Sequence, residues 1–455
     1  MPPRSAVLLV STYELGHAPF ALAVAASFLE RAGFDVSCFD AAVEPFDAAR
    51  FARADVIAIS TPMHTALRLA MPLLDRINVR IHGAKPAATV GFFGLYASLN
   101  ARELLDRGAA FVLGGECEAM LVDVVSAIES GASLEPFAPA PPTLKRLDFP
   151  SISRRHLPLD HPRYARLVDD GGERKTAYVE ASRGCLHMCR HCPIPPVYGG
   201  RFFVLPKARV LDDVAAQIDA GASHVTFGDP DFLNAPTHAL SIARALHARS
   251  PAVTFDFTAK VEHLLRHRAR LVELRELGCA FVVSAVESLS DLVLARLEKG
   301  HTRDDVVRLV EVMNEAALPV RPTFVPFTPW STLDDQRALL RFLDEHDLHD
   351  HVDPVQLSIR LLVPPGSRLL ELEDVRRVLV GEPAPGSFHH PWRHEDPSVD
   401  RLSSQIAAIV EDGAAREEPS RATIDRVRLA SGLGPGRARA RASKRVPHLT
   451  EPWFC

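Results

Sequence analysis

The fold is decided by the stretch Glu180-Ala-Ser-Arg-Gly184-Cys185-Leu-His-Met-Cys189-Arg-His-Cys192-Pro193, which carries three thiols at Cys-x3-Cys-x2-Cys spacing. It directly follows a predicted strand at residues 177–181. The number of thiols is informative, because a structural zinc site normally has four protein ligands and simple ferredoxin clusters also use four cysteines. Cys185, Cys189 and Cys192 would therefore leave one iron of a four-iron, four-sulfur cluster open.

An open iron at this position indicates a particular kind of small molecule. The iron can chelate an amino and a carboxylate group, and a reduced cluster can pass one electron into a sulfonium bond. S-Adenosylmethionine meets both demands, and a loop at the carboxyl end of a barrel strand lies where barrel active sites are found. The alternative is a zinc knuckle with His187 or His191 as fourth ligand, which would make the chain a zinc-binding structural or sensor protein.

Short apolar runs on both sides of the cysteine stretch predict two α/β units. The first is an open α/β domain with strands at residues 6–10, 36–39, 56–59, 88–90 and 111–113. The second is a partial (β/α)6 TIM-like barrel with strands at residues 177–181, 224–227, 254–258, 280–284, 320–325 and 355–361. Frequent prolines from residue 131 to 162 predict an interdomain linker between them.

These patterns divide the chain into four expected regions. They are the open α/β domain at 1–130, the linker at 131–170, the barrel at 171–365 and a small, mostly helical carboxy-terminal region with a partly disordered tail at 366–455. In an open α/β sheet the ligand crevice lies beyond the carboxyl ends of the strands. We therefore expect the loops after the first strands to line a binding site.

Composition narrows the class of protein. Hydrophobic residues make up 47% and charged residues 24%, as in soluble globular chains. A net charge of -5 gives no long-range attraction to nucleic acid, and no apolar run at the amino terminus is long enough for a signal peptide or a membrane span. We expect a cytoplasmic protein with no nucleic-acid or membrane partner. Among the seven cysteines, Cys38, Cys117 and Cys279 lie in apolar segments and are expected to be buried, inert thiols.

From residue 178 to 364 the sequence resembles the radical S-adenosylmethionine (SAM) superfamily, on the cysteine spacing and the strand exits that follow it. The resemblance implies a [4Fe-4S] cluster on the three cysteines, SAM as a second cofactor, and Arg183 and Gly184 as residues that shape the cluster loop. His191 departs from the aromatic residue that commonly precedes the third cysteine in the family. The implied partners are a small-molecule substrate and an electron donor such as ferredoxin or flavodoxin.

The strand exits supply the SAM-binding residues that this resemblance implies. Gly228 and Asp229, after the second strand, stand where relatives contact the amino group of SAM. Glycine permits close backbone approach, and a carboxylate accepts charge-assisted hydrogen bonds from an ammonium. Ser284 and Glu287, after the fourth strand, match the element that binds the ribose hydroxyls, and Thr323 opens the fifth-strand exit, where relatives pack the adenine.

The amino-terminal domain resembles, in architecture over residues 5–126, the domain of the cobalamin-binding subfamily of this superfamily. The turn Gly114-Gly115-Glu116-Cys117-Glu118 is similar to a Gly-Glu-rich turn of that subfamily, whereas the Asp-x-His-x-x-Gly signature is absent. The resemblance implies cobalamin as a third cofactor; the alternative is a lid or a substrate platform. His17, in the first strand's exit loop, is expected to face solvent rather than to bind cobalt.

The segment Pro447-His-Leu-Thr-Glu451-Pro-Trp-Phe-Cys455 resembles the start of the tail in the CUAEP/CCAEP-tail radical enzyme family. Those proteins continue with cysteine or selenocysteine and then Ala-Glu-Pro. Our hypothesis is a selenoprotein whose chain stops at Cys455 because a UGA selenocysteine codon was read as a stop. The alternative is a frayed terminus with an incidental thiol.

The expected function is reductive cleavage of SAM by the cluster. It would yield a 5′-deoxyadenosyl radical that abstracts hydrogen from a substrate, with cobalamin-dependent methylation as the further possibility that the amino-terminal domain implies. A second hypothesis is transfer of the aminocarboxypropyl group of SAM to a soft acceptor. The third is the zinc-binding scaffold or sensor.

Overall fold

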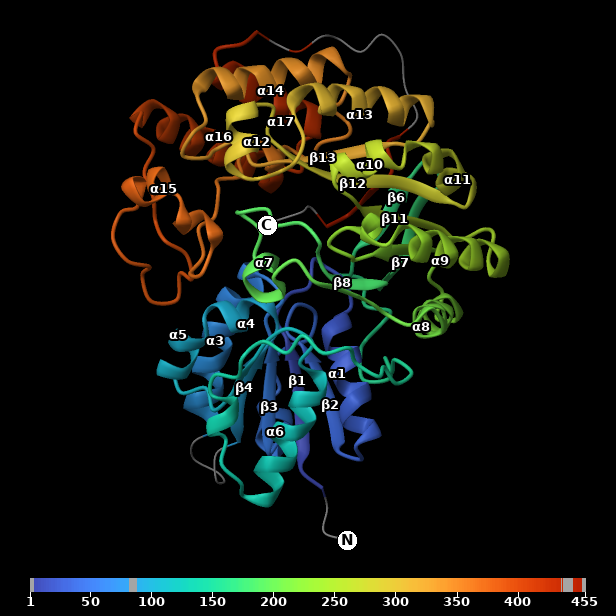
Figure 1. Ribbon diagram of the computed structural model, residues 1–455, viewed down its shortest axis with the longest axis vertical. Coiled ribbons are helices and arrows are strands. Elements are labelled where there is room, and N and C mark those ends of the chain that lie inside the picture. Colours follow the sequence, from blue (N-terminus) through green and yellow to red (C-terminus); the bar gives the residue numbers. More distant parts are fainter. Residues whose placement is uncertain (1–3, 82–87, 435, 437–444, 452–455) are drawn as a thin grey trace.

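The structure, a computed structural model, describes residues 4–81, 88–434, 436 and 445–451. Two large sheets with their own helices lie one above the other along the long axis of the molecule (Figure 1). Among the described residues no helix combines the length and the apolar character that crossing a bilayer requires. Cys455 and most of the basic segment 437–445 fall outside the described residues, so the hypothesis on the tail is not tested by the structure.

The amino-terminal sheet is parallel, with strand order β2-β1-β3-β4-β5. Its elements, in chain order, are β1 Ala6–Ser11, α1 Phe20–Arg31, β2 Asp35–Asp40, α2 Ala48–Arg53, β3 Val56–Ser60, α3 His64–Ile81, β4 Thr89–Phe93, α4 Leu95–Leu99, α5 Ala101–Asp106, β5 Val112–Leu113 and α6 Glu118–Ser130.

Both faces of this sheet are covered, as expected for parallel strands with helical crossovers. Side chains alternate along β1: Val7 and Leu9 pack with α1 and α6, whereas Leu8 and Val10 pack with the helices on the other face. The chain order of the strands reverses between β1 and β3. That topological switch point is where open α/β sheets bind ligands.

The barrel sheet has strand order β13-β12-β11-β10-β7-β6-β14. Its elements, in chain order, are β6 Arg166–Asp169, β7 Gly172–Val179, β8 Ser182–Gly184, α7 Ile194–Tyr198, β9 Phe202–Val204, α8 Lys207–Asp219, β10 His224–Phe227, α9 Pro236–Arg249, β11 Thr254–Thr258, α10 Val261–Arg266, α11 Leu271–Glu276, β12 Cys279–Glu287, α12 Asp291–Arg296, α13 Arg303–Glu315, β13 Val320–Phe324 and α14 Leu333–Glu345. Strands β8 and β9 form a separate small sheet.

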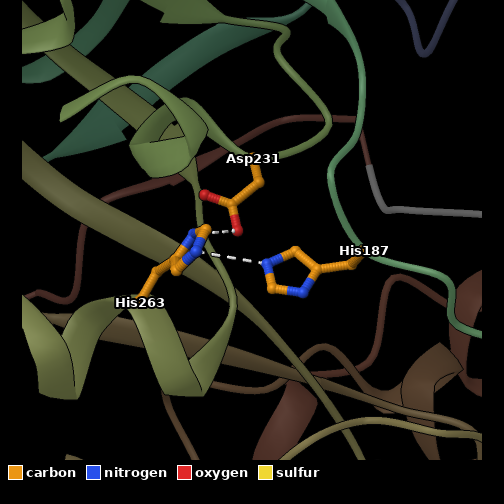
Figure 2. Close-up of side chains that lie close together, drawn as sticks. All are labelled: His187, Asp231 and His263. Carbon is orange, nitrogen blue, oxygen red and sulfur yellow. Dashed lines mark hydrogen bonds and ion pairs between the residues drawn. The ribbon is translucent and has the colours of Figure 1, made fainter. Parts of the chain in front are cut away.

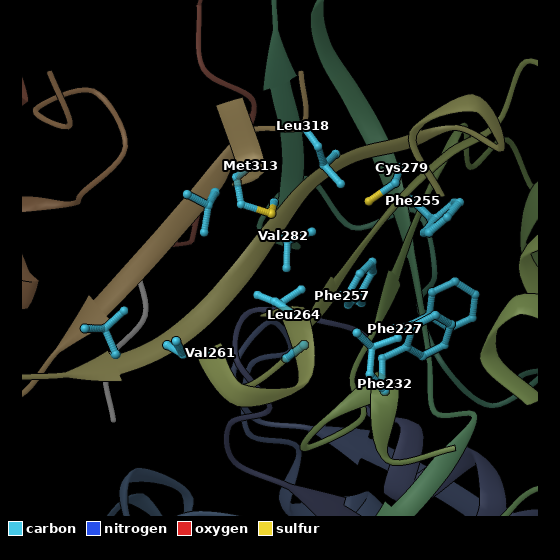
Figure 3. Packing of buried hydrophobic residues seen from close by; sticks show 14 of the residues in the cluster. Phe227, Phe232, Phe255, Phe257, Val261, Leu264, Cys279, Val282, Met313 and Leu318 are labelled. Atoms are coloured by element: carbon cyan, nitrogen blue, oxygen red, sulfur yellow. The ribbon is translucent and has the colours of Figure 1, made fainter. Parts of the chain in front are cut away.

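The parallel strands β7, β10, β11, β12 and β13 form a half-barrel whose helix-covered face holds the main core. Aromatic side chains from β10 and β11, including Phe227, Phe255 and Phe257, lie close to Val282 of β12 and to α10 (Figure 3). Phe281 alternates with Val282 and therefore lies on the opposite face, in a small cluster with Leu449. The sequence prediction of an α/β domain followed by a partial barrel is confirmed in its class.

Two segments differ from the sequence prediction. The expected sixth strand at 355–361 is instead a 3-10 helix at Pro354–Leu357, and only an isolated bridge joins Phe327 to Arg360. The alternation of apolar and polar residues from Val355 to Leu361 is typical of a strand, but Gln356 is buried and its side chain accepts a hydrogen bond from the Phe324 amide of β13. At the other edge, β6 lies within the expected linker, yet it pairs antiparallel with β7 and so extends the barrel sheet.

The carboxy-terminal region is mostly helical, with α15 Glu373–Val378, α16 Pro397–Ala415 and α17 Ser420–Ala430. It ends in the short strand β14 His448–Leu449, which pairs antiparallel with β6. Beyond β14, Glu451 accepts a 2.7 Å hydrogen bond from the Tyr13 hydroxyl in the loop after β1. This last described segment therefore crosses from the barrel sheet to the amino-terminal domain.

Candidate active site

The three cysteines lie on the loop between β8 and α7. The small β8–β9 sheet anchors this loop, and the Cys185 amide donates a 3.1 Å hydrogen bond to the Arg201 carbonyl beside β9. Gly184 has φ +74°, and a Cβ at this position would lie 2.4 Å from the same carbonyl oxygen. Only glycine fits both demands, which agrees with the loop-shaping role expected for Gly184.

The thiols are close enough to influence one another electrostatically. Burial raises the pKa of Cys192 to about 12, and negative charge on Cys189 and Cys185 raises it further in the same direction. A cationic iron-sulfur cluster removes this repulsion because its irons bind thiolates. The Asn234 amide nitrogen lies 3.6 Å from Cys185 Sγ, and hydrogen bonds to ligand sulfur are among the contacts that tune such clusters. The residues present therefore fit a [4Fe-4S] cluster.

The exit of β10 supports the beginning of the cluster loop. Asp229 accepts hydrogen bonds from the Ala181 amide at 2.9 Å and from the Ser182 hydroxyl at 2.5 Å, one on each carboxylate oxygen. Burial raises the pKa of Asp229 to about 7. A Cβ at Gly228 would lie 2.1 Å from the Tyr178 hydroxyl. Both residues thus have structural contacts in this chain, and their contact with SAM remains a prediction.

Glu287 stands at a strained position at the end of β12. Its φ is +68°, and the β12–β13 register shifts between Ala285 and Glu287; such strain concentrates at functional sites. Burial alone would raise the pKa of Glu287, but Lys299 at 3.1 Å and His191 at 3.3 Å hold it well below its usual range. The carboxylate is therefore ionised and already paired.

The contacts of Glu287 with Lys299 and His191 were not predicted from the sequence. Lys299 lies in the segment that leads into α13, and Thr302 caps that helix through a capping box with Asp305. Ser284 and Thr323 lie on neighbouring strands near Glu287. The Ser284 hydroxyl is fully buried and has no hydrogen-bond partner among the described residues. Ser284 alternates with Val283 along β12 and therefore lies on the helix-covered face with Val282 and Val286; its contact with SAM remains a prediction.

Two histidines from different elements meet an aspartate beside the cluster loop (Figure 2). His187 Nε2 of the cluster loop lies 3.2 Å from His263 Nε2 of α10, and His263 Nδ1 lies 2.8 Å from Asp231 Oδ2 after β10. Burial, with Lys260 and His263 nearby, lowers the pKa of His187 to about 4. The sequence suggested His187 or His191 only as a fourth zinc ligand beside the cysteines. In the structure His187 lies against His263 and near Asp231, and His191 lies against Glu287.

The carboxyl edge of the amino-terminal sheet has unpaired polar groups. Ser11 ends β1 and Ser60 ends β3, opposite each other in register at the switch point. Both hydroxyls are buried and have no hydrogen-bond partner among the described residues. Buried polar groups are normally satisfied, so these two hydroxyls fit a ligand that supplies polar groups, as the amide-rich rim of cobalamin does.

A cavity of about 490 Å³ lies beside this edge, between the loops after β1 and β2 and helix α3. Tyr13, His17 and Glu451 are among its lining residues. His17 is buried and stacks on Tyr178 of β7, with ring centroids 4.5 Å apart. The expectation that His17 faces solvent was therefore wrong, because a strand 161 positions away in the fold's other sheet covers it.

A buried ionic cluster joins the two domains next to the cysteines. Arg183 lies 2.5 Å from Glu118, 2.8 Å from Glu180 and 3.8 Å from Glu116, measured between guanidinium nitrogen and carboxylate oxygen. Glu116 and Glu118 belong to the turn after β5, and the Tyr198 hydroxyl also donates to Glu116. Sequence reasoning noted the turn and Arg183 separately and missed their contact. Cys38, Cys117 and Cys279, in contrast, are buried as expected.

Comparison with known families assigns a domain to each sheet. Residues 179–343 match the Radical SAM superfamily model, and residues 6–125 match the B12 binding domain model. The cofactors of this chain are therefore a [4Fe-4S] cluster, SAM and cobalamin. The match to the Radical SAM model supports an iron-sulfur cluster over a zinc knuckle, and the assignment of Cys185, Cys189 and Cys192 as its ligands remains a prediction.

The sequence relatives include methyltransferases. An uncharacterized methyltransferase of Pyrococcus horikoshii is 23% identical over 59% of this chain and 59% of its own length. The hopanoid C-3 methylase of Methylococcus capsulatus is 26% identical over 62% of this chain and 55% of its own length. The chain thus spans less than two thirds of these curated relatives.

Solved structures show the same fold. The cobalamin-dependent SAM radical enzyme OxsB, with aqua-cobalamin and SAM bound, has a TM-score of 0.67 at 15% identity, covering 90% of this chain and 67% of its own. The radical SAM methyltransferase TsrM from Kitasatospora setae has a TM-score of 0.60 at 19% identity, covering 76% and 73%. At identities of 15% and 19% this similarity shows the fold alone.

Proposed function

Because the chain is a radical SAM enzyme with a B12-binding domain, we propose that it methylates a small-molecule substrate in a cobalamin-dependent reaction. The reduced cluster would supply the electron for cleavage of SAM to a 5′-deoxyadenosyl radical, and cobalamin would supply the methyl group. The observation that carries the proposal is that the two ligand-binding edges lie against each other. His17 at the β1 exit stacks on Tyr178 of the barrel, and Arg183 beside the cysteines is held by Glu116 and Glu118 at the β5 exit.

The chain's own residues have distinct parts in this proposal. Cys185, Cys189 and Cys192 bind the cluster, and Gly184 gives their loop its turn. Ser284, Glu287 and Thr323 form the end of the barrel proposed to hold the ribose and adenine of SAM; Glu287 is kept ionised by Lys299. Gly228 and Asp229 fix the second strand exit against the start of the cluster loop.

Cobalamin would be held at the carboxyl edge of the amino-terminal sheet. The hydroxyls of Ser11 and Ser60, which find no hydrogen-bond partner among the residues the structure describes, are the proposed hydrogen-bonding groups. The proposed domain boundaries follow the sequence, with cobalamin-binding residues 1–130, a linker to 170, a barrel to 365 and a carboxy-terminal region to 455. A reductant is needed, and ferredoxin or flavodoxin is the proposed electron donor.

The deciding experiment is anaerobic reconstitution with SAM, cobalamin and a reductant, followed by identification of the nucleoside products. We expect 5′-deoxyadenosine together with S-adenosylhomocysteine, because SAM would serve both as radical source and as methyl source. Methylthioadenosine would instead indicate aminocarboxypropyl transfer. If the visible absorption of an iron-sulfur cluster is absent, the result would support the zinc-binding hypothesis instead.

We also propose that the chain belongs to the CUAEP/CCAEP-tail group, on the sequence of residues 447–455 alone. The coding sequence tests this directly. A UGA codon after Cys455 followed by codons for Ala-Glu-Pro is the expected result. A UAA stop, or other downstream codons, would contradict it.

A further inference from the structure

The three side chains of Figure 2 form a second cluster of potential metal ligands that does not include the cysteines. They come from three different elements: His187 from the cluster loop, Asp231 from the segment after β10 and His263 from α10. Asp231 and His263 are buried, whereas the His187 side chain is 17% exposed. The group is therefore covered by protein around Asp231 and His263 and is accessible to solvent at His187.

Asp231 is held firmly in place. Its Oδ1 accepts a 2.9 Å hydrogen bond from the Leu233 amide, and its Oδ2 accepts one of 3.2 Å from the Lys260 amide. These bonds fix the carboxylate between two consecutive strand exits of the barrel. A metal ligand fixed in this way loses little conformational freedom on binding, as the supporting contacts around metal sites generally ensure.

The contact between Asp231 and His263 is close without being a hydrogen bond. His263 Nδ1 lies 2.8 Å from Asp231 Oδ2, yet this nitrogen has no hydrogen-bond partner among the described residues. Neighbouring ligands of an ion with bonds of about 2.1 Å lie about 3 Å apart, and each points at the ion and not at the other. The distance and the poor alignment together fit two ligands of one ion.

His187 completes the set. One nitrogen from each imidazole and one carboxylate oxygen lie within 4.8 Å of one another. Binding to a common ion would draw them to roughly 3–3.5 Å, which a movement of roughly 1–2 Å by the partly exposed His187 ring supplies. Two imidazoles and one carboxylate suit Zn²⁺, Fe²⁺ and similar ions and leave coordination positions open.

We propose that His187, Asp231 and His263 bind one divalent first-row transition-metal ion, separate from the iron-sulfur cluster and independent of the reaction proposed above. This ion would tie the middle of the cysteine loop to α10. Its open positions would face the accessible side of the site, where water can bind.

The test uses the full chain with its iron-sulfur cluster already assembled, so that Zn²⁺ cannot occupy the cysteines. After titration with Zn²⁺ and desalting, we expect one bound zinc per chain with the cluster absorption unchanged. X-ray absorption at the zinc edge should show nitrogen and oxygen ligands at about 2.0–2.1 Å and no sulfur at about 2.3 Å. Sulfur ligands, or no retained zinc, would overturn the proposal.

Variants assign the ion to these residues. His263→Ala and, separately, Asp231→Asn should each weaken zinc binding at least tenfold, while cluster iron and far-ultraviolet circular dichroism stay as in the wild type. His267→Ala is the matched control, because His267 follows the same helix and lies outside the three-residue group; it should bind zinc normally. Wild-type affinity in His263→Ala, or equal loss in the control, would refute the assignment.

Discussion

The carboxyl edges of the two sheets are built differently. At the barrel edge, the acidic side chains already have partners from the protein: Asp229 with Ala181 and Ser182, and Glu287 with Lys299 and His191. At the amino-terminal edge, the Ser11 and Ser60 hydroxyls are buried and have no hydrogen-bond partner in the part of the chain that the structure describes. The barrel edge is thus a pre-ordered frame around the cysteine loop, whereas the other edge keeps hydrogen-bonding groups free for a ligand.

The strongest test of this contrast is removal of a cluster ligand from the barrel edge. Cys189→Ala should abolish the cluster, because two remaining thiolates cannot hold it, and iron should fall from about four atoms per chain to near zero. Iron analysis and visible absorption measure this. Cys279→Ala is the control, since that buried thiol lies in β12 away from the loop. Normal iron content in Cys189→Ala would reject the cluster assignment.

The buried ionic cluster around Arg183, which links the two domains, should give the next largest effect, on the free energy of unfolding. Arg183→Met leaves Glu116, Glu118 and Glu180 buried without their cation, and removing one partner of a buried ion pair costs about 3–5 kcal/mol. Urea denaturation should show this loss in the free energy of unfolding.

A surface arginine provides the comparison for Arg183. Arg209 bonds the Phe149 carbonyl and the Ser151 hydroxyl at a partly exposed position, so Arg209→Met should cost less than about 1 kcal/mol. Equal effects in the two variants would mean that the ionic cluster does not join the domains.

The free energy of unfolding should also depend on pH through Asp229 at the barrel edge. Asp229 has a pKa of about 7 in the folded chain against 3.8 when unfolded, chiefly because of burial. Its contribution to stability is therefore complete below pH about 4, falls as the pH rises and is gone above about 7, with a slope of at most about 1.4 kcal/mol per pH unit. Asp229→Asn should remove that slope. Melting curves from pH 5 to pH 8 that stay parallel in the two proteins would contradict this account.

The smallest effect on stability is expected at the amino-terminal edge. Ser60→Ala removes a hydroxyl that makes no hydrogen bond to any described residue, so the free energy of unfolding without cobalamin should change by less than about 0.5 kcal/mol. Cobalamin affinity should nevertheless fall about five- to tenfold, the value of one hydrogen bond of about 1–1.4 kcal/mol. Equilibrium dialysis measures it. Unchanged affinity would show that this hydroxyl does not contact the cofactor.

The sequence was most informative where the signal is local. Cys185, Cys189 and Cys192 lie within one loop, so their spacing alone indicated a cluster with an open iron. Parallel strands such as β1 and β3 are apolar up to the serine that ends each of them, and they were located within a few residues. The segment 355–361 alternates apolar and polar residues as a strand does, yet it begins with a 3-10 helix in which Gln356 is buried and accepts a hydrogen bond from the Phe324 amide.

Contacts between distant segments could not be predicted. His17 is covered by Tyr178, and Arg183 is held by Glu116 and Glu118, through packing of the two domains and not through any local pattern. The grouping of His187 with Asp231 and His263 likewise requires three loops to converge at one end of the barrel. Residue type and spacing identify candidates, whereas their partners depend on the tertiary fold.

The pairing of β14 with β6 has a consequence for how the molecule is made. Strand β6 emerges early from the ribosome, but the residue that bonds the Arg166 amide, Thr450, follows 284 positions later. Synthesis at roughly 5–20 residues per second leaves that strand edge without its partner for tens of seconds. An unpaired edge is a site of aggregation. The nascent chain therefore depends on β14 to protect this edge of the barrel sheet.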